Sequence, residues 1–251
     1  MNNKKYIDKK AFFDKVVTIY GRNPVIEALE DNTLSIYKLH LSLSNKPNKQ
    51  IDKIIKLAKK RDIEILYHDK KALSYISKNS KQDQGVALDI LMQHPIRVDE
   101  FLSAKDSSYR IIALDGISNP QNLGMIIRSC VAGDIDAIIL PTKKSAQISP
   151  LVIKASAGTL FRIPIIKSDN LLDDIKKLKK DNAKVYTLSS HANIDYKKEV
   201  YPSKVVFVLG NESEGVSKEI ENISDSSIKI PMNRGVESLN VAVTASLLAF
   251  L

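Results

Sequence analysis

The sequence predicts an α/β protein with a mainly parallel β-sheet in its second part and a smaller α/β unit before it. Short β-branched runs alternate with helical patterns after residue 108, which is typical of a parallel sheet covered by helices on both faces. The 251 residues include 43% hydrophobic ones, enough for a substantial core. The runs expected to form strands span residues 109–116, 136–141, 161–166, 183–188, 204–210 and 226–231.

The first part of the chain has its own alternation of strand and helix patterns. Residues 48–62 carry apolar side chains at helical spacing, beginning with Ile51, Ile54 and Ile55. Short alternating or β-branched runs on either side indicate strands. These runs span residues 36–44, 63–68 and 85–92. The first part is therefore expected to be a small, separate α/β unit.

A stretch of mixed composition divides the two parts. Residues 94–108 combine proline, serine and charged side chains without steady periodicity, which indicates a linker. We therefore expect one domain before this stretch, ending at residue 93, and a second one after it, at 109–251. Residues 1–100 hold 19 Lys and Arg against 13 Asp and Glu, so two thirds of the net charge of +9 lies there.

Charge and cysteine content restrict the classes of partner and compartment. A net charge of +9 and a pI near 9.3 favour a polyanionic partner such as nucleic acid, although a generic lysine-rich protein has the same composition. The single cysteine, Cys130, excludes an internal disulfide, and no Cys/His spacing suits zinc, so no metal is expected. Without an apolar signal-peptide core or a run of about 20 apolar residues, the sequence predicts a cytoplasmic protein.

The first strand of the second part ends in a polar loop. Asp115 and Gly116 follow the apolar run, and Asn119 and Pro120 are suited to the N-cap and first position of a helix. The apolar stripe of this helix is Leu123, Ile126, Ile127, Cys130 and Val131, which assigns Cys130 to the core. Arg128 lies off the stripe, one turn beyond Gly124, whose missing side chain leaves room for the guanidinium. Taken alone, Arg128 has the pattern of a solvated surface arginine.

Two further strand ends carry unusual residues. Gly210 follows a buried run and allows a close backbone approach or a positive φ, and Glu212 would then project at the sheet edge. Taken alone, Glu212 is equally consistent with a solvated hairpin carboxylate. Ser238 is the expected N-cap of a final apolar helix, and Asn240 in its first turn needs a partner or a ligand, structural or functional. Because parallel strands end at one edge, we expect these groups to gather there.

The three polar segments resemble known motifs. "SNPQNLGMIIRS", "FVLGNESEGV" and "IPMNRGVESLNVAVTASLL" are similar to the three ordered motifs of the SpoU (TrmH) family of S-adenosylmethionine-dependent RNA ribose 2′-O-methyltransferases, in the SPOUT superfamily. "YGRNPVIEAL" and "QGVALDI" resemble the substrate-binding domain of its ribosomal RNA guanosine branch. The resemblance spans roughly residues 18–251. It therefore implies a first domain at 18–93 and leaves a basic leader at 1–17 uncovered.

The resemblance implies a fold, a cofactor and a set of site residues. Family members thread the C-terminal segment through a trefoil knot and work as homodimers, and the apolar last helix would lie in that interface. S-adenosylmethionine would be held by backbone groups, which carry over to Gly210, Ile230 and Leu239, with Leu188 a weaker candidate. The polar motif residues carry over as the catalytic set, which is Asn119, Arg128, Glu212, Ser238 and Asn240.

The implied function is methyl transfer to the 2′-hydroxyl of a guanosine in large-subunit ribosomal RNA. The basic domain 18–93 would bind the RNA, its lysines meeting phosphates. The same chemistry on transfer RNA and a non-catalytic, RNA-binding ribosome-assembly factor remain alternatives. A nucleotide-dependent dehydrogenase is excluded because no GxGxxG follows the first strand of either part.

Overall fold

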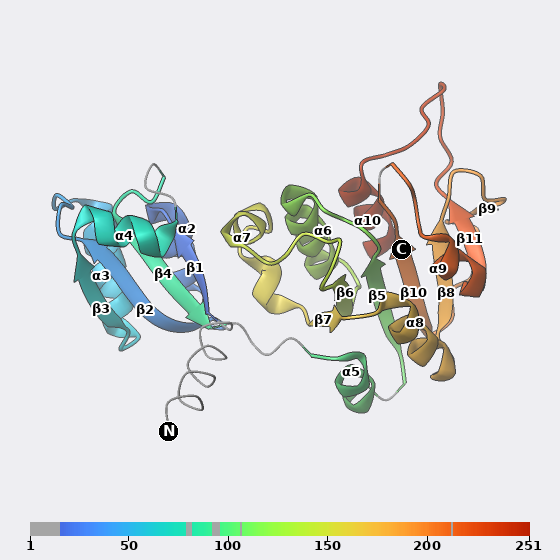
Figure 1. Cartoon of the computed structure of the whole chain (residues 1–251), viewed down its shortest axis with the longest axis horizontal. Helices are drawn as coiled ribbons and strands as arrows, with labels where there is room; N and C mark the ends of the chain where they lie inside the picture. Colours follow the sequence, from blue (N-terminus) through green and yellow to red (C-terminus); the bar gives the residue numbers. More distant parts are fainter. Residues whose placement is uncertain (1–15, 79–81, 92–95, 106, 212) are drawn as a thin grey trace. The chain divides into compact units, whose positions relative to one another are not determined.

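The computed structural model describes residues 16–78, 82–91, 96–105, 107–211 and 213–251. The chain divides into two compact units, Met1–His94 and Pro95–Leu251 (Figure 1). Each unit has its own sheet and its own hydrophobic core, so each is described by itself.

The N-terminal unit is built on a four-stranded mixed sheet. Its strand order is β1-β4-β2-β3, with β4 antiparallel to both neighbours and β2 parallel to β3. Consequently β1, β2 and β3 run in one direction, and each is followed by a helix. The elements are β1 Val16–Tyr20, α2 Arg22–Glu30, β2 Ser35–Ser42, α3 Lys49–Lys60, β3 Glu64–His68, α4 Lys70–Ser77 and β4 Val86–Leu91.

The strands and the helix expected in the first part are confirmed. Ile51, Ile54 and Ala58 are buried along α3, and Asn48 caps that helix by accepting hydrogen bonds from the N–H groups of Gln50 and Ile51. Three further elements were not expected: β1, α2 and α4. Val16 and Val17 lie in the segment predicted as a leader, but they pair with β4 and form the first two residues of β1.

The C-terminal unit contains a seven-stranded sheet in which every neighbouring pair is parallel, with order β7-β6-β5-β10-β8-β11-β9 (Figure 1). The predicted parallel α/β architecture is therefore confirmed. The elements are α5 Val98–Ala104, β5 Tyr109–Leu114, α6 Pro120–Ala132, β6 Ala137–Pro141, α7 Pro150–Ala155, the 3-10 helix η1 Thr159–Arg162, β7 Ile165–Ser168, α8 Leu171–Lys180, β8 Lys184–Leu188, β9 Ile194–Asp195, β10 Lys204–Leu209, α9 Lys218–Ile223, β11 Ser226–Lys229 and α10 Val241–Ala249.

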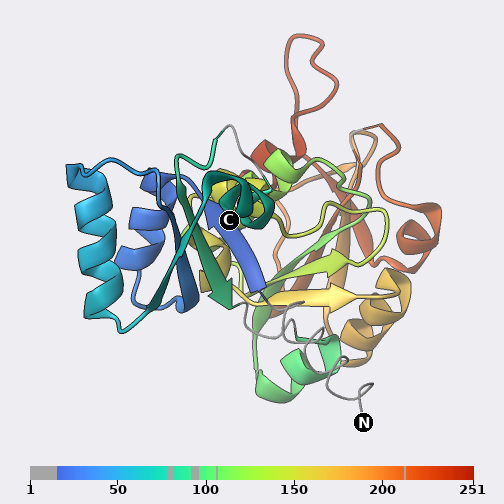
Figure 2. The same ribbon diagram turned by 60° about the vertical axis from the view of Figure 1, so that its left-hand side comes forward.

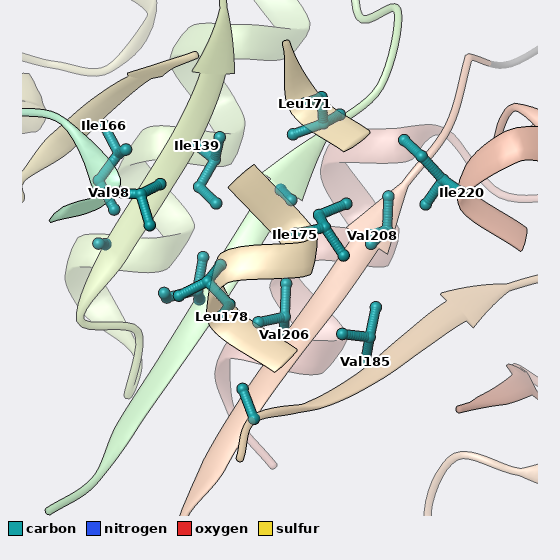
Figure 3. Close-up of a cluster of buried hydrophobic side chains, with 14 of the residues drawn as sticks. Val98, Ile139, Ile166, Leu171, Ile175, Leu178, Val185, Val206, Val208 and Ile220 are labelled. Atoms are coloured by element: carbon teal, nitrogen blue, oxygen red, sulfur yellow. The ribbon is translucent and has the colours of Figure 1, made fainter. Parts of the chain in front are cut away.

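Helices α5, α8 and α9 cover one face of this sheet. Ile175 and Leu178 of α8 lie over Val206 and Val208 of β10 (Figure 3). Helix α6 lies on the opposite face and packs against both α7 and α10. The central strands are thus buried from both sides, which explains why they are continuous apolar runs and do not alternate.

Two segments differ from the sequence-based expectation. The segment expected to be a linker contains α5, whose Phe101 is buried against Tyr109 with 5.5 Å between ring centroids. This helix belongs to the C-terminal unit because its apolar side packs on the sheet. The run 161–166 is helical only at its first two residues, and β7 begins at Ile165, directly after Pro164, which has no N–H to donate to a ladder.

None of the described helices combines the length and the apolar character needed to cross a membrane.

Candidate active site

The ends of β5 and β10 lie side by side at the carboxyl edge of the parallel sheet. Leu209 pairs with Leu114, and the Asp115 N–H donates to the Leu209 carbonyl at 2.8 Å. The polar loops after these two strands therefore start from the same point, as expected from the sequence. The connection from β11 to α10, residues 230–240, starts from the same edge but projects away from the sheet (Figures 1 and 2).

Hydrogen bonds hold the first two loops together. The Asn211 side-chain amide donates to the Gly116 carbonyl at 3.1 Å, and the Asp115 carboxylate accepts from the Ser217 N–H at 2.8 Å. Asn211 and Gly215 also exchange two backbone hydrogen bonds, of 3.0 and 2.8 Å. The loop after β10 is thus closed on itself and fixed to the loop after β5.

Gly210 is a glycine because the backbone of its own loop passes close to it. A Cβ at this position would overlap the backbone of Gly215 and Val216. The positive φ lies at Gly215, at +73°. Of the two reasons anticipated for a glycine at position 210, close approach is confirmed and left-handed geometry is wrong. Glu212, predicted from the same motif, lies outside the described residues.

The helix predicted after β5 forms as expected. Asn119 is its N-cap, with Oδ1 accepting from the Gln121 N–H at 2.8 Å, and Pro120 is its first residue. Leu123, Ile126, Ile127 and Cys130 are buried along it. Burial raises the pKa of the Cys130 thiol to about 12, which suits a core residue and not a nucleophile.

The space beside Gly124 serves helix packing. We expected it to make room for the Arg128 guanidinium, but that was wrong: a Cβ on Gly124 would lie 2.7 Å from the Val152 carbonyl oxygen of α7. Arg128 is exposed on the outer side of α6. Its side chain makes no hydrogen bond or ion pair with the residues that the structure describes. The guanidinium is therefore available to a ligand.

Asn240, and not Ser238, caps the final helix. Its Oδ1 accepts from the Ala242 N–H at 2.9 Å, and its Nδ2 donates to Asn122 Oδ1 at 3.1 Å. Ser238 is exposed, two residues before the cap, because the helix starts only where Val241 and Ala242 are buried. The burial expected of Asn240 is wrong, because this residue is exposed. Its side chain nevertheless has a structural partner, the buried amide of Asn122 on α6, which links the third motif to the first.

Three polar residues at this edge were not assigned any role from the sequence. They are Asp115, Asn122 and Asn211, which make the contacts between the motifs. Asn122 gave a signal, because an amide beside the apolar stripe of a buried helix needs a partner. That partner lies 118 residues away in the chain, so spacing could not identify it.

The backbone groups of the predicted cofactor residues are open to a ligand. Among the residues that the structure describes, Gly210, Ile230 and Leu239 have no hydrogen-bond partner for their N–H and C=O groups. All three are partly buried. Partly buried backbone groups without a protein partner can bind a ligand or water.

Comparison with known families agrees with this geometry. Residues 109–250 match the SpoU rRNA methylase family, and residues 18–95 match the RNA 2′-O ribose methyltransferase substrate-binding family. The chain belongs to the SpoU family. A Staphylococcus epidermidis protein assigned to the TrmH family of tRNA/rRNA methyltransferases is 32% identical to this SpoU protein, over 93% of this chain and 94% of its own. A Mycobacterium leprae protein named as a tRNA/rRNA methyltransferase is 30% identical, over 92% of this chain and 74% of its own.

Solved structures of methyltransferases share the fold. The methyltransferase AviRb from Streptomyces viridochromogenes, in complex with S-adenosylmethionine, aligns with a TM-score of 0.78 at 18% identity, over 96% of this chain and 90% of its own. A Sinorhizobium meliloti rRNA methyltransferase with S-adenosylmethionine bound aligns at 0.72 and 23% identity, over 98% and 88%. The two-unit architecture of this SpoU protein is therefore one that the solved structures also have.

Proposed function

We propose that this chain transfers a methyl group from S-adenosylmethionine to the ribose 2′-hydroxyl of a guanosine in large-subunit ribosomal RNA. The observation that carries the proposal is the joining of the three motif segments by the contacts from Asn211 to Gly116 and from Asn240 to Asn122. Membership of the SpoU family and the S-adenosylmethionine bound to two similar structures support the choice of reaction and cofactor.

The residues present fit this cofactor. S-adenosylmethionine, when bound, supplies a methyl group on a positively charged sulfur. Gly210, Ile230 and Leu239 offer backbone donors and acceptors that have no hydrogen-bond partner among the described residues. A neutral set of backbone groups suits a ligand that carries both charges, because it binds the polar edges without attracting one sign of charge alone.

Arg128 is the residue proposed to contact the reacting hydroxyl. A guanidinium is a permanent cation that offers only hydrogen-bond donors, so the contribution of Arg128 is to orient the hydroxyl oxygen or a neighbouring phosphate. Holding that oxygen in line with the methyl group is the main requirement, since the sulfonium is already activated. Asn119 and Glu212 would position the nucleotide or Arg128, and Ser238 and Asn240 would order the cofactor loop.

The N-terminal unit is proposed to hold the RNA. The exposed side of α3 carries lysines at every turn, and phosphate contacts of this kind weaken as salt rises. The α/β domain at 18–93 would thus bind substrate and the domain at 109–251 would carry the chemistry. We also propose that residues 230–251 are threaded through the trefoil knot of the family.

The assembly is proposed to be a homodimer formed through α6 and α10. Met125 of α6, Val243 of α10 and Phe250 beyond it are 42%, 47% and 65% exposed in the single chain. Large apolar side chains exposed on neighbouring elements are typical of a surface that a partner covers. Sedimentation velocity over a range of concentrations, with Val243→Asp as the disrupting variant, tests this.

Methyl transfer is tested with tritiated S-adenosylmethionine and unmodified ribosomal or transfer RNA. We expect label at one guanosine 2′-oxygen of large-subunit RNA, lowered roughly 100-fold or more in Arg128→Ala, because a group contacting the reacting oxygen contributes on that order. Binding of S-adenosylmethionine to Arg128→Ala, measured by calorimetry, should be unchanged. Label in transfer RNA would show that transfer RNA, and not ribosomal RNA, is the substrate. Cofactor binding without label in any RNA would favour a non-catalytic assembly factor.

A further inference from the structure

A pocket of about 550 Å³ lies at one edge of the N-terminal sheet. Its walls come from several elements, and the side chains that matter most are Arg22, Asn45, Gln50, Lys70, Asp83 and Gln84. The volume falls within the range of small-molecule sites, roughly 300 to 1,000 Å³. The pocket is lined mainly by polar and charged groups, with Leu73 the one apolar side chain in the lining among described residues.

The direction of the strands explains why these residues meet. Strands β1, β2 and β3 run the same way, so the helices that follow them all begin at one edge. Arg22 is the first residue of α2, Gln50 the second of α3 and Lys70 the first of α4. The two cations therefore stand beside helix N-termini, whose partial positive charge adds to theirs.

The charge in the pocket is positive because two cations, Arg22 and Lys70, stand against one carboxylate, Asp83, whose oxygens are already hydrogen-bonded. Asp83 accepts from the Gly85 N–H and from the Ser77 hydroxyl, each at 3.0 Å. Arg22 donates through Nε to the Gln84 carbonyl at 3.3 Å, which orients the guanidinium and leaves both terminal nitrogens without partners among the described residues. Lys70 forms no ion pair within the described part of the chain. An anion can thus be met by both cations.

The amides supply one donor and one acceptor beside these cations. Gln84 accepts from the Arg22 N–H at 3.1 Å through Oε1, so its NH₂ group is available. Gln50 donates from Nε2 to Asn23 at 2.9 Å, so its Oε1 is available. Asn45 donates to the Gly85 carbonyl at 2.7 Å, and its side chain occupies the space that a Cβ on Gly85 would need. This close contact holds the Asn45 side chain in the wall of the pocket.

We propose that this pocket binds one unpaired nucleotide of the substrate RNA, with its phosphate against Arg22 and Lys70 and its base edge against the amides of Gln50 and Gln84. A phosphate alone would leave most of the volume empty, and a donor beside an acceptor is complementary to the edge of a base. RNA-binding proteins obtain sequence specificity from bases that are unpaired and accessible. The inference rests on the proposed function, since it takes RNA as the substrate.

The test compares two neighbouring lysines of α4 in the full-length chain. Both Lys70 and Lys71 are exposed and each Lys→Ala change removes one charge, but only Lys70 lines the pocket. We expect Lys70→Ala to weaken binding of a fluorescent fragment of large-subunit ribosomal RNA roughly tenfold, the loss of one charge-assisted contact, and Lys71→Ala less than twofold. Arg22→Ala should weaken it at least as much as Lys70→Ala. Thermal unfolding of each variant controls for folding.

A second arm separates RNA from free nucleotides. Inorganic phosphate and the four nucleoside 5′-monophosphates are titrated as competitors, and we expect each to compete only at millimolar concentration. Equal losses for Lys70→Ala and Lys71→Ala, no loss for either, or nucleoside monophosphate binding as tight as RNA would overturn the inference. S-adenosylmethionine binding, measured without RNA, should not change in these variants. Failure of the wild type to bind that cofactor or to methylate RNA counts against the proposed function instead.

Discussion

The two units place polar groups at a sheet edge in different ways. In the N-terminal unit, α2 and α4 begin two residues after β1 and β3 end, so the charged residues Arg22 and Lys70 reach the edge directly. In the C-terminal unit, longer connections follow β5, β10 and β11, and they present backbone groups and amides. The two edges therefore differ in chemistry: the N-terminal edge presents cations beside helix N-termini, and the C-terminal edge presents backbone groups and amides together with the carboxylate of Asp115.

The largest effect on stability is expected at Gly210, where the loop after β10 is most crowded. Gly210→Ala places a Cβ inside the backbone of the same loop, at Gly215 and Val216, so the loop must move. We expect a loss of about 3 kcal/mol in the free energy of unfolding of the C-terminal unit, the upper end for overpacking, together with loss of S-adenosylmethionine binding. Urea unfolding and calorimetry measure the two effects. Gly158→Ala is the comparison variant: its Cβ would meet no atom within 4 Å, so with φ at +75° it reports backbone strain alone, about 1 to 2 kcal/mol, and cofactor binding should persist. Normal cofactor binding by Gly210→Ala would contradict the proposed cofactor contact.

A smaller effect is expected at the cap of α10. Asn240→Ala removes the cap to the Ala242 N–H and the bond to Asn122, for a combined loss of about 2 kcal/mol in the free energy of unfolding. Ser238→Ala, two residues away and exposed, should change stability by less than about 0.5 kcal/mol. Chemical unfolding of both variants gives the comparison. If Ser238→Ala is as destabilising as Asn240→Ala, the assignment of the cap is wrong.

The smallest effect is a pH dependence of the N-terminal unit alone. A line of hydrogen bonds crosses its sheet from Thr18 through Asp89 and His40 to His68. Burial, and then His40 nearby, lower the pKa of His68 below its ordinary value of 6.5. The unfolded chain therefore binds the proton more readily, so this contribution to stability is complete above pH 6.5 and decreases as the pH falls below it.

Hydrogen exchange read by mass spectrometry can follow this dependence in β3. After correction for the intrinsic exchange rate, peptides covering β3 should lose protection between pH 7.5 and 5.5, and peptides covering β10 should lose less. His68→Phe should flatten the dependence. An unchanged pH response in that variant would assign the effect to another group.

At the candidate active site, the features that depend on neighbouring residues in the sequence could be predicted, and the contacts between distant segments could not. The Asn119–Pro120 cap follows from residue types that occupy those positions in any helix, and the burial of Cys130 follows from helical spacing. The last cap shifts from Ser238 to Asn240 because the helix starts only where Val241 and Ala242 are buried, and the other partner of Asn240, Asn122, lies in a different helix. The space beside Gly124 is likewise filled by α7, and no pattern in the sequence around Gly124 indicates that contact.

The N-terminal pocket shows the same limit more strongly. Its residues come from segments between Arg22 and Gly85 that meet only because three strands share a direction. The sequence patterns correctly predicted three strands and a helix in this part but missed β1, α2 and α4. Of these, α2 and α4 begin at the pocket. Without their directions, Arg22 and Lys70 were indistinguishable from the other cations of a basic domain.

The bond between Asn240 and Asn122 also bears on the order in which the protein is made. Helix α6 and all seven strands of the parallel sheet leave the ribosome before α10, which comes last among the described elements. During that interval Asn122 lacks the contact from Asn240, and the segment proposed to hold the cofactor is not yet anchored. A nascent chain therefore has a folded RNA-binding unit well before it has a complete methyl-transfer site, so it would bind RNA first and acquire activity only when α10 docks.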